Sequence, residues 1–420
     1  MNQVVVTGLG FISSIGNSKS EVTESLKTLT HGFAPFPHLE GEDSPVQLYG
    51  SIKEFDTSST DPEDWVYPER FKIKRQLRRT MSPNVLFAHC AALDAISDAG
   101  LTLDDISNPE TGLYSASAGS AAFQSAQMTI LNSKGVKRLS PFAVVNSTVG
   151  TINFNLVASL KIKGAVCGLA SACASSAHAL GFAFDEIRSG RQERMLVIGA
   201  EDGDRASILP FAAMRALSPK SDPREASCPF DVKRSGFVGT GGAAALILES
   251  REAAEARKAE IYAEFSGWGQ AADGYNPAMS HPEGEGLARS MNLALKVCDL
   301  SPADIDYVNA HGTSTPVGDL SEVRALKTVF GEDKGRPEIS STKALTGHGL
   351  SMAGALEAGI CCLAIKESFT PGSAHITKLV EEAESLNIIR ETKDSGPGTA
   401  LSSSSGFGGA NVSLIFRKDS

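Results

Sequence analysis

The sequence predicts an α/β protein with largely buried sheets. Short apolar runs of strand length alternate with longer segments that have helical spacing, and both halves of the 420-residue chain follow the order strand, helix, strand, helix. No low-complexity tract or linker separates the halves, which favours one compact unit. We therefore expect an internal duplication with its break near residue 255, giving an N-terminal half, 1–254, and a C-terminal half, 255–420.

The expected elements of the first half begin with a short apolar strand. Residues 31–64 contain many Pro, Gly, Asp and Ser residues, so we interpret them as an irregular excursion from the core. The remaining expectations follow from apolar periodicity and from glycine stops. In chain order they are strand Val4–Val6, helix Ser20–Leu29, helix Val85–Ala99, strand Gly112–Ser117, a strand-to-helix segment Cys167–Arg188, and strands Met195–Gly199 and Ala243–Glu249.

The second half restarts with an apolar run at residue 261. Its helices are expected at amphipathic or wholly apolar stretches, and its last strand follows a Gly-rich loop. The expected elements are helix Gly286–Cys298, strand Ile305–Val308, helix Leu320–Val329, a buried helix over Ser351–Ile365 and strand Asn411–Phe416.

Composition and charge exclude several classes of function. Hydrophobic residues make up 41% of the chain and charged residues 21%, which is ordinary for a soluble globular protein. The net charge of −10 argues against a nucleic-acid-binding protein. The seven cysteines form no C-x-x-C pair, so neither a zinc site nor a disulfide framework is indicated, and a reducing, cytoplasmic setting is expected. No signal peptide or membrane span is expected, because the sequence has neither a basic leader nor a long enough apolar run.

Cys173 is the first candidate catalytic residue. It lies in the small-residue segment G-L-A-S-A-C-A-S-S-A-H, where a loop leads into a helix that is expected to begin at or near the cysteine. The free N–H groups and positive end of a helix favour thiolate, so the thiol pKa is expected to fall. By itself, the segment is equally consistent with a buried, inert cysteine in a Gly/Ala-rich helix.

A histidine follows the strand expected near residue 305. His311 stands on a Gly turn at the carboxyl end of that strand, where α/β proteins place their sites. Two hydroxyls follow it, Thr313 and Thr315, which could bind a polar arm of a ligand. The alternative is a Thr-rich turn that bonds only to its own backbone.

Two further segments carry polar groups of interest. Lys343 precedes His348 in a Gly/Thr loop and could supply positive charge, and Glu357 lies inside an apolar helix, where it needs a partner such as Lys343 or His348. The loop G-F-G-G-A-N at residues 406–411 could offer a backbone N–H to an oxyanion. Each of these signals is modest by itself, because surface lysines, capping histidines and glycine-rich turns are common.

Together these motifs resemble the β-ketoacyl-acyl-carrier-protein synthases, most closely the elongating synthase I type. The resemblance rests on S-A-C-A-S-S-A-H, H-G-T-S-T-P-V-G-D, S-T-K-A-L-T-G-H and G-F-G-G-A-N, and it extends over nearly the whole chain. Initiating synthases resemble the chain less, because their second basic residue is usually Asn where this chain has His348.

The resemblance implies a thiolase-like fold, in which two duplicated βαβαβ halves form five layers, αβαβα. It implies that Cys173 accepts an acyl group from an acyl carrier protein and that His311 and His348 stabilise the enolate formed when malonyl thioester loses CO₂. Lys343 and Glu357 would tune the histidines, and Thr313 and Thr315 would bind the phosphopantetheine arm. The backbone N–H groups of Cys173 and Phe407 would form the oxyanion hole. No metal or bound organic cofactor is implied, and relatives of this type are usually dimers.

A basic cluster at residues 70–79 contrasts with the acidic chain. On charge alone, this cluster could be a solvated helix face. In the family, the equivalent region docks the acidic carrier protein, which implies this role for Arg75 and Arg79. Lys134 and Lys137 form a second candidate patch.

Departures from the family pattern place the substrate in question. Ser405 stands where fatty-acid synthases usually have a gating Phe, and Gly119 stands where synthase II often has a bulky residue that lines the acyl pocket. A roomier tunnel is therefore expected. A ketosynthase of a type II polyketide system, paired with a chain-length-factor subunit, is the main alternative to fatty-acid elongation, and it would make the chain part of a heterodimer rather than a homodimer.

Two other classes fit less well. A degradative thiolase usually has a second acid/base cysteine near its C-terminus, and no cysteine follows Cys362. A non-catalytic partner subunit should lack the nucleophile, whereas Cys173 and both histidines are present.

Overall fold

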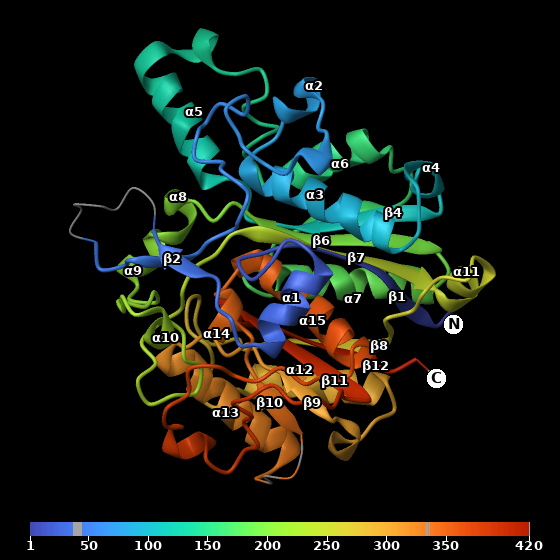
Figure 1. Ribbon diagram of the computed structural model, residues 1–420, viewed down its shortest axis with the longest axis vertical. Helices are drawn as coiled ribbons and strands as arrows, with labels where there is room; N and C mark the ends of the chain where they lie inside the picture. The colour runs from blue at the N-terminus through green and yellow to red at the C-terminus, as the bar shows by residue number, and fades with distance from the viewer. Residues whose placement is uncertain (37–43, 333–334, 336, 420) are drawn as a thin grey trace.

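The core of the protein is one ten-stranded mixed sheet, which the computed structural model describes for residues 1–36, 44–332, 335 and 337–419 (Figure 1). The strand order is β10-β9-β11-β12-β8-β1-β7-β6-β4-β5. The strands of the first half are β1 Val4–Ile12, β4 Thr111–Ala116, β5 Val166–Leu169, β6 Arg194–Glu201 and β7 Gly242–Ser250. Those of the second half are β8 Ala263–Ala272, β9 Tyr307–Asn309, β10 Glu338–Ser340, β11 Thr399–Gly406 and β12 Ala410–Arg417.

The two halves of the sheet have the same topology. In each half the first strand pairs antiparallel with the fifth, the fifth pairs antiparallel with the fourth, and the second pairs in parallel with the fourth and the third. The halves join where Val4–Val6 of β1 pairs with Ala263–Phe265 of β8. The mixed α/β class expected from the alternating pattern is confirmed.

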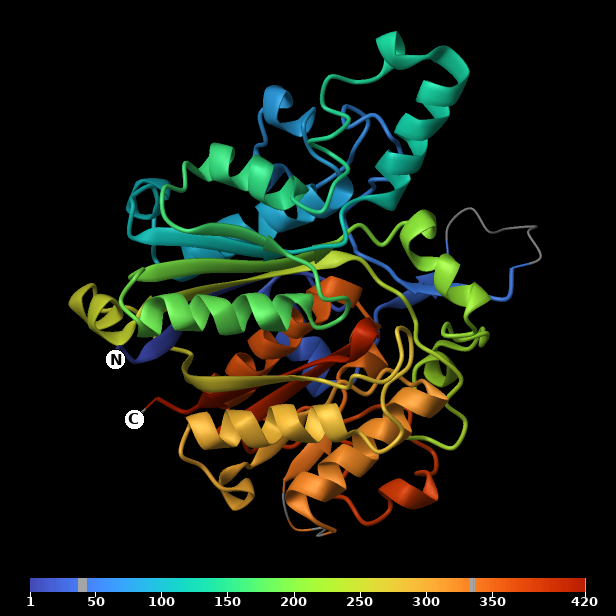
Figure 2. The same cartoon turned by 180° about the vertical axis from the view of Figure 1, so that it is seen from behind.

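Helices cover both sides of each half-sheet (Figure 2). The outer helices α3 Pro83–Asp98 and α6 Thr151–Leu160 pack on the first half, and α12 Glu285–Val297 packs on the second beside α13 Pro316–Phe330. Two helices, α7 Ser175–Arg188 and α15 Ala353–Lys366, lie between the half-sheets and contact each other. Every residue of α15 from Ala353 to Ile365 is buried, as expected for a helix that is apolar on all sides.

Glycines let these central elements approach closely. A Cβ on Gly354 of α15 would lie 2.6 Å from the backbone nitrogen of Ala177, and a Cβ on Gly181 of α7 would lie 2.3 Å from the Trp268 ring of β8. A larger residue at either position would push the halves apart, so the glycines fix how α7 sits against the second half.

The shorter elements lie mostly at the periphery. The excursion at residues 31–64 contains the two-stranded sheet β2–β3 among its described residues, and α5 projects away from the core (Figure 1). The remaining helices are α1 Lys19–Lys27, α2 Arg75–Arg78, α4 Leu103–Ile106, α5 Ala121–Lys134, α8 Arg205–Ile208, α9 Pro210–Ala213, α10 Pro223–Ala226, α11 Arg251–Ala256 and α14 Lys343–Thr346, and the two outlying strands are β2 Phe33–Pro35 and β3 Leu48–Gly50.

Two differences from the expected elements matter for the site. The helix expected from Leu320 begins four residues earlier, at Pro316, with Thr315 at its N-cap position. The helix expected at or near Cys173 does begin there, at Ser175. Strand β11 covers Thr399–Gly406, where the sequence did not predict a strand. It lies between β9 and β12, and the side chains of Ser402, Ser403 and Ser404 are buried there.

Candidate functional site

A cavity of about 590 Å³ brings the candidate catalytic residues together. Its walls come from both halves: the turn before α7 supplies one side, and the segments after β9, around α14 and at the end of β11 supply the other. The predicted residues that line it are Cys173, His311, Thr313, Thr315, His348, Ser405 and Phe407.

Cys173 lies on a tight turn between β5 and α7. The preceding residue, Ala172, has a φ of +51°, which is unusual for a residue with a side chain. The thiol is half-buried, and His348 Nε2 lies 3.0 Å from Cys173 Sγ. The candidate nucleophile and a candidate base are therefore in direct contact.

The two histidines face the same space at right angles. The ring centroids of His311 and His348 are 5.2 Å apart with an interplanar angle of 88°. The edge of Phe237 packs on His348 at 5.1 Å, which fixes the orientation of that ring. The histidines lie 37 positions apart in the sequence, and both line the cavity together with Cys173.

The thiol pKa does not fall as the sequence analysis expected. Burial raises the pKa of Cys173 to about 12, although the nearby Lys343 charge lowers it. The helix N-terminus is present, but the cost of placing a thiolate in this weakly hydrated wall outweighs it. Cys173 is thus a thiol with an adjacent imidazole.

Both histidines are neutral. Burial holds the pKa of His311 and of His348 well below the usual value, and the positive charge of Lys343 lowers both further. A neutral imidazole can donate one hydrogen bond or accept one proton, which is what an enolate oxygen or a thiol requires.

Lys343 and Glu357 form a buried ion pair beneath the histidines. Lys343 Nζ contacts Glu357 Oε1, and both side chains are almost completely buried. Glu357 Oε2 has no hydrogen-bond partner among the described residues. Burial raises the pKa of Glu357 to about 7, with Lys343 opposing the shift. The partner expected for Glu357 from the sequence is therefore Lys343.

Glu322 is a site residue that the sequence analysis did not identify. Its carboxylate accepts hydrogen bonds from the backbone N–H groups of His311 and Gly312, at 2.8 and 2.6 Å, and from the Ser403 hydroxyl at 2.8 Å. It therefore fixes the turn that carries His311. A buried face that includes Glu322 and Val323 in helix α13 is the signal that could have identified it.

The Gly-rich loop lies against the turn that carries Cys173. A Cβ on Gly406 would lie 2.6 Å from the Ser171 carbonyl oxygen and 3.2 Å from the Cys173 nitrogen, so only glycine allows this approach. Phe407 follows in the cavity wall, and its ring lies 5.8 Å from that of Phe211. The backbone of this loop is thus next to the backbone of Cys173.

The two threonines and Ser405 lie on the cavity wall, whereas Gly119 does not. Thr313 Oγ1 and Thr315 Oγ1 are 3.0 Å apart. Ser405 donates a hydrogen bond of 2.8 Å to Asn411 Oδ1. Gly119 is not part of this wall; it has a φ of +87°, and a Cβ there would lie 2.6 Å from the Ser147 carbonyl oxygen.

The basic residues lie outside the cavity on the surface. Arg75 is exposed and pairs with Glu63 at 2.7 Å, and Arg79, Lys134 and Lys137 are exposed as well. No helix in the described part of the chain is long and apolar enough to span a membrane. Within the same residues, no cluster of three or more His, Cys, Asp or Glu side chains has the arrangement of a metal site.

Known proteins match the chain along its length. A family model described as "Beta-ketoacyl synthase, N-terminal domain" matches residues 1–254, and one described as "Beta-ketoacyl synthase, C-terminal domain" matches residues 262–377. The chain is 40% identical over 423 residues to "3-oxoacyl-[acyl-carrier-protein] synthase 1" of Haemophilus influenzae, with 100% of this chain and 99% of that protein covered.

Two solved structures give the same picture for the fold. A crystal structure of a beta-ketoacyl synthase from Burkholderia phymatum has a TM-score of 0.90 and 33% identity, with both chains fully covered. A type II polyketide ketosynthase, solved in complex with its acyl-carrier protein and bound to the hexaketide, has a TM-score of 0.88 and 28% identity, again with 100% of both chains covered.

Proposed function

The chain belongs to the β-ketoacyl synthase family, and we propose that it condenses an acyl group carried on Cys173 with malonyl-acyl carrier protein in fatty-acid elongation. The observation that carries this proposal is the contact of 3.0 Å between Cys173 Sγ and His348 Nε2, with a second neutral histidine, His311, facing the same space. The product is β-ketoacyl-acyl carrier protein, with CO₂ released.

In the first step, the thiol attacks the thioester of the acyl carrier protein. Because the pKa of Cys173 is raised to about 12, the thiol needs a base, and His348 Nε2 accepts its proton as the C–S bond forms. The proton then passes to the departing pantetheine sulfur, which restores neutral His348. The N–H groups of Cys173 and Phe407 bind the oxyanion, and one such donor is typically worth about 2.7–4 kcal/mol.

In the second step, malonyl thioester loses CO₂. For this step His348 changes to the tautomer with its hydrogen on Nε2. His311 and His348 then donate hydrogen bonds to the thioester oxygen, which carries the charge of the resulting enolate. Because burial and Lys343 hold both imidazolium pKa values well below the usual value, both rings stay neutral, and no imidazolium is present to protonate the carbanion early. The carbanion attacks the acyl-Cys173 carbonyl and expels the thiolate. Thr313 and Thr315 bind the pantetheine arm in the cavity.

The fold proposed for this activity is thiolase-like, with two duplicated halves in five layers, αβαβα, and a boundary near residue 255. Its support is the identical strand order of the two half-sheets and the placement of α7 and α15 between them. In this arrangement the N-terminal half supplies Cys173, and the C-terminal half supplies both histidines.

The partner proposed for the basic surface is the acidic acyl carrier protein. Arg75 and Arg79 supply one patch, and Lys134 and Lys137 a second. We expect the double charge reversal R75E/R79E to raise KM for the carrier substrate at low salt with little effect on kcat. An unchanged KM in steady-state assays at several salt concentrations would contradict this assignment.

The proposed assembly is a dimer formed through the edge of the sheet. Strand β5 ends the sheet, and Val166, Cys167 and Gly168 on it are exposed. Phe154, on the neighbouring helix α6, is 51% exposed. An uncovered apolar edge favours pairing with another chain, either a second copy or a related chain-length-factor subunit. The proposed location is the cytoplasm, where the seven free cysteines stay reduced.

Ser405 favours a second candidate function. It lines the cavity with a small polar side chain in place of a bulky gate, and the matched type II polyketide ketosynthase is bound to a hexaketide in its structure. In this alternative the chain is the ketosynthase subunit of a type II polyketide synthase and acts with a chain-length-factor partner.

One experiment tests both candidates. The protein is incubated with acyl- and malonyl-carrier protein, and the intact mass of the carrier products is measured. A single two-carbon extension supports fatty-acid elongation, whereas repeated extension that needs a partner subunit supports the polyketide function. No condensation under either condition would overturn the enzymatic proposal.

Covalent labelling provides the matched control. Iodoacetamide should modify Cys173, and peptide mass spectrometry must separate it from the exposed Cys167. Cys173→Ala should abolish both the labelling and the condensation, and Cys167→Ala should leave the condensation intact.

A further inference from the structure

The turn before the nucleophile has an unfavourable backbone conformation. Ala172 has a φ of +51°, in the left-handed region where glycine is the usual residue. The chain places Ala at this position, directly before Cys173. A conformation of this kind persists only when surrounding contacts hold it.

Ser175 contacts both sides of this turn. Its hydroxyl accepts a hydrogen bond of 2.7 Å from the Ser171 N–H and donates one of 2.6 Å to the Ala172 carbonyl oxygen. The backbone N–H of Ser175 also donates to that oxygen, at 3.1 Å. The first turn of α7 is therefore hydrogen-bonded to Ser171 and Ala172, the two residues that precede Cys173.

His178 holds the same turn from the other side. Its Nδ1 lies 2.7 Å from Ser171 Oγ, and its Nε2 lies 3.0 Å from Gln270 Oε1. Because the Gln270 oxygen can only accept, Nε2 carries the proton and Nδ1 accepts from the Ser171 hydroxyl. Gln270 belongs to β8, so this chain of bonds connects the nucleophile turn to the half that carries the other catalytic groups.

The turn also sets the position of the Gly-rich loop. The Ser171 carbonyl and the Cys173 nitrogen are the groups that Gly406 approaches most closely. A shift of the turn would therefore change the distance from Cys173 Sγ to His348 and the placement of the loop backbone together.

We propose that Ser175 and His178 are positioning residues that hold the segment Ser171–Cys173, called here the nucleophile turn, in its reactive conformation. Neither side chain needs to touch the substrate. The inference rests on the proposed function, because it assigns the turn to the alignment of an attacking thiol.

The test compares Ser175→Ala with a matched control, Ser290→Ala. The Ser290 hydroxyl is also buried in a helix and also bonds the carbonyl three residues earlier, at 2.8 Å, but it lies in α12 outside the cavity. The readouts are the rate of Cys173 alkylation by iodoacetamide, followed by peptide mass spectrometry, and kcat and KM for the carrier substrates.

We expect Ser175→Ala to lower the alkylation rate and kcat about tenfold, which corresponds to the cost of an unsupported left-handed residue, with KM unchanged. Ser290→Ala should leave both rates at the level of the unmodified protein. The decisive variant is the double substitution A172G/S175A, because glycine adopts this φ at little cost. It should recover most of the lost rate, which a general loss of stability would not do.

Equal alkylation rates for Ser175→Ala and the unmodified protein would overturn the proposal, as would a failure of A172G/S175A to recover the rate. If Ser175→Ala does not fold, His178→Phe decides the matter, because it keeps the stacked contact with Phe182 and removes the acceptor for Ser171 together with the donor to Gln270. Alkylation needs no carrier substrate, so a protein that fails to condense but shows this pattern would refute the proposed function and leave the positioning role standing.

Discussion

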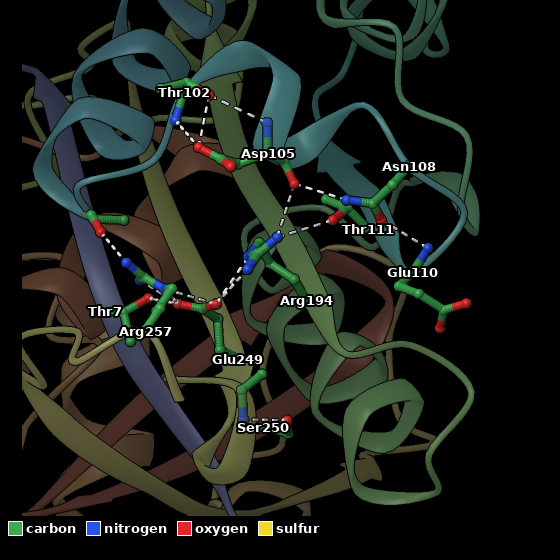
Figure 3. Close-up of polar contacts among 12 residues, drawn as sticks. Thr7, Thr102, Asp105, Asn108, Glu110, Thr111, Arg194, Glu249, Ser250 and Arg257 are labelled. Carbon is green, nitrogen blue, oxygen red and sulfur yellow. Dashed lines mark hydrogen bonds and ion pairs between the residues drawn. The ribbon is translucent and has the colours of Figure 1, made fainter. Parts of the chain in front are cut away.

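Two buried carboxylates, Glu249 and Glu357, meet positive charge in different ways. Glu249, at the end of β7, bonds to Arg194, Arg257 and Thr7, with an Arg194 Nη2–Oε1 distance of 2.8 Å and a Thr7 Oγ1–Oε2 distance of 2.7 Å (Figure 3). Glu357 meets only Lys343, and its second oxygen has no partner among the described residues. Both oxygens of Glu249 have partners, so it is called saturated here. Only one oxygen of Glu357 has a partner among the described residues, so it is called half-bonded.

The pKa values move in opposite directions as a result. Burial raises the pKa of Glu249, but bonds to Arg257, Arg194 and Thr7 outweigh it, and the net pKa is lowered. For Glu357, burial dominates over Lys343 and the pKa rises to about 7. The saturated group links strands β1, β6 and β7, and the half-bonded group lies under the reactive histidines. Buried polar groups thus bond strands together in one region, whereas in the other the Lys343 charge lowers the pKa values of His311 and His348.

The largest expected effect is on stability, from Glu249→Ala. It leaves two partly buried guanidinium groups without their carboxylate, and breaking a buried pair by removing one partner typically costs about 3–5 kcal/mol, with the lower end expected here. Urea denaturation should show this loss, while kcat per folded molecule stays unchanged because the network does not reach the cavity. A loss below about 1 kcal/mol would mean that Arg194 and Arg257 find other acceptors.

Lys343→Met should have the opposite effect to Glu249→Ala, with a large loss of kcat and a smaller loss of stability. Removing the charge beneath His311 and His348 should lower kcat by about 10²–10³, the range for losing one electrostatic contribution in a site of this kind. Stability should fall less than in Glu249→Ala, because Glu357, with a pKa of about 7, can take up a proton and become neutral. Parallel measurement of kcat and urea denaturation in both variants checks this; a larger loss of stability in Lys343→Met would contradict the contrast.

The pH dependence of stability should have opposite signs at the two carboxylates. For Glu357 the folded pKa is raised, so between about 4.5 and about 7 the folded state binds more protons and its contribution to stability falls as pH rises. For Glu249 the folded pKa is lowered, so its contribution is present above 4.5 and is lost as pH falls. Unfolding free energies from pH 4 to 7.5 should therefore lose the neutral-side slope in Glu357→Gln and the acid-side slope in Glu249→Gln. Identical profiles would refute the assignment.

The sequence predicted which residues come together at the site, but it did not predict how their surroundings shift their pKa values. Cys173 and His311 follow strand ends, and Cys173 precedes a helix, so α/β topology predicted that such segments meet at one edge. Desolvation of Cys173 arises only when the cavity wall is assembled from both halves of the chain. The sequence therefore predicted a lowered pKa for Cys173, whereas burial raises it. The sequence likewise did not identify Glu322 as a site residue. Its carboxylate accepts a hydrogen bond from the His311 N–H only because the folded chain places that turn beside helix α13.

The fold was predictable where apolar periodicity was strong. Helices α3, α12 and α15 and strands β6 and β7 were expected within a few residues of their observed bounds. Strand β11 was missed because Ser402–Ser405 has no alternation of apolar and polar residues; it forms because β9 and β12 bond to it on both sides. The exposed helix α5 gave no apolar stripe to detect.

The smallest expected effect comes from the exposed ion pairs of Glu63, which extend the comparison to the surface. Glu63 bonds to Arg75 at 2.7 Å and to Arg78 at 3.2 Å, and these contacts lower its pKa. In water such pairs add little to stability, so Glu63→Gln should leave the melting temperature unchanged within error. It removes a negative charge from the surface proposed to dock the carrier protein, so KM for the carrier substrate should fall modestly at low salt and return to the unmodified value at high salt. KM for the carrier substrate is measured in parallel for Glu63→Gln and R75E/R79E. If KM does not change in Glu63→Gln, Arg75 is not part of the docking surface, and Lys134 and Lys137 become the patch to test.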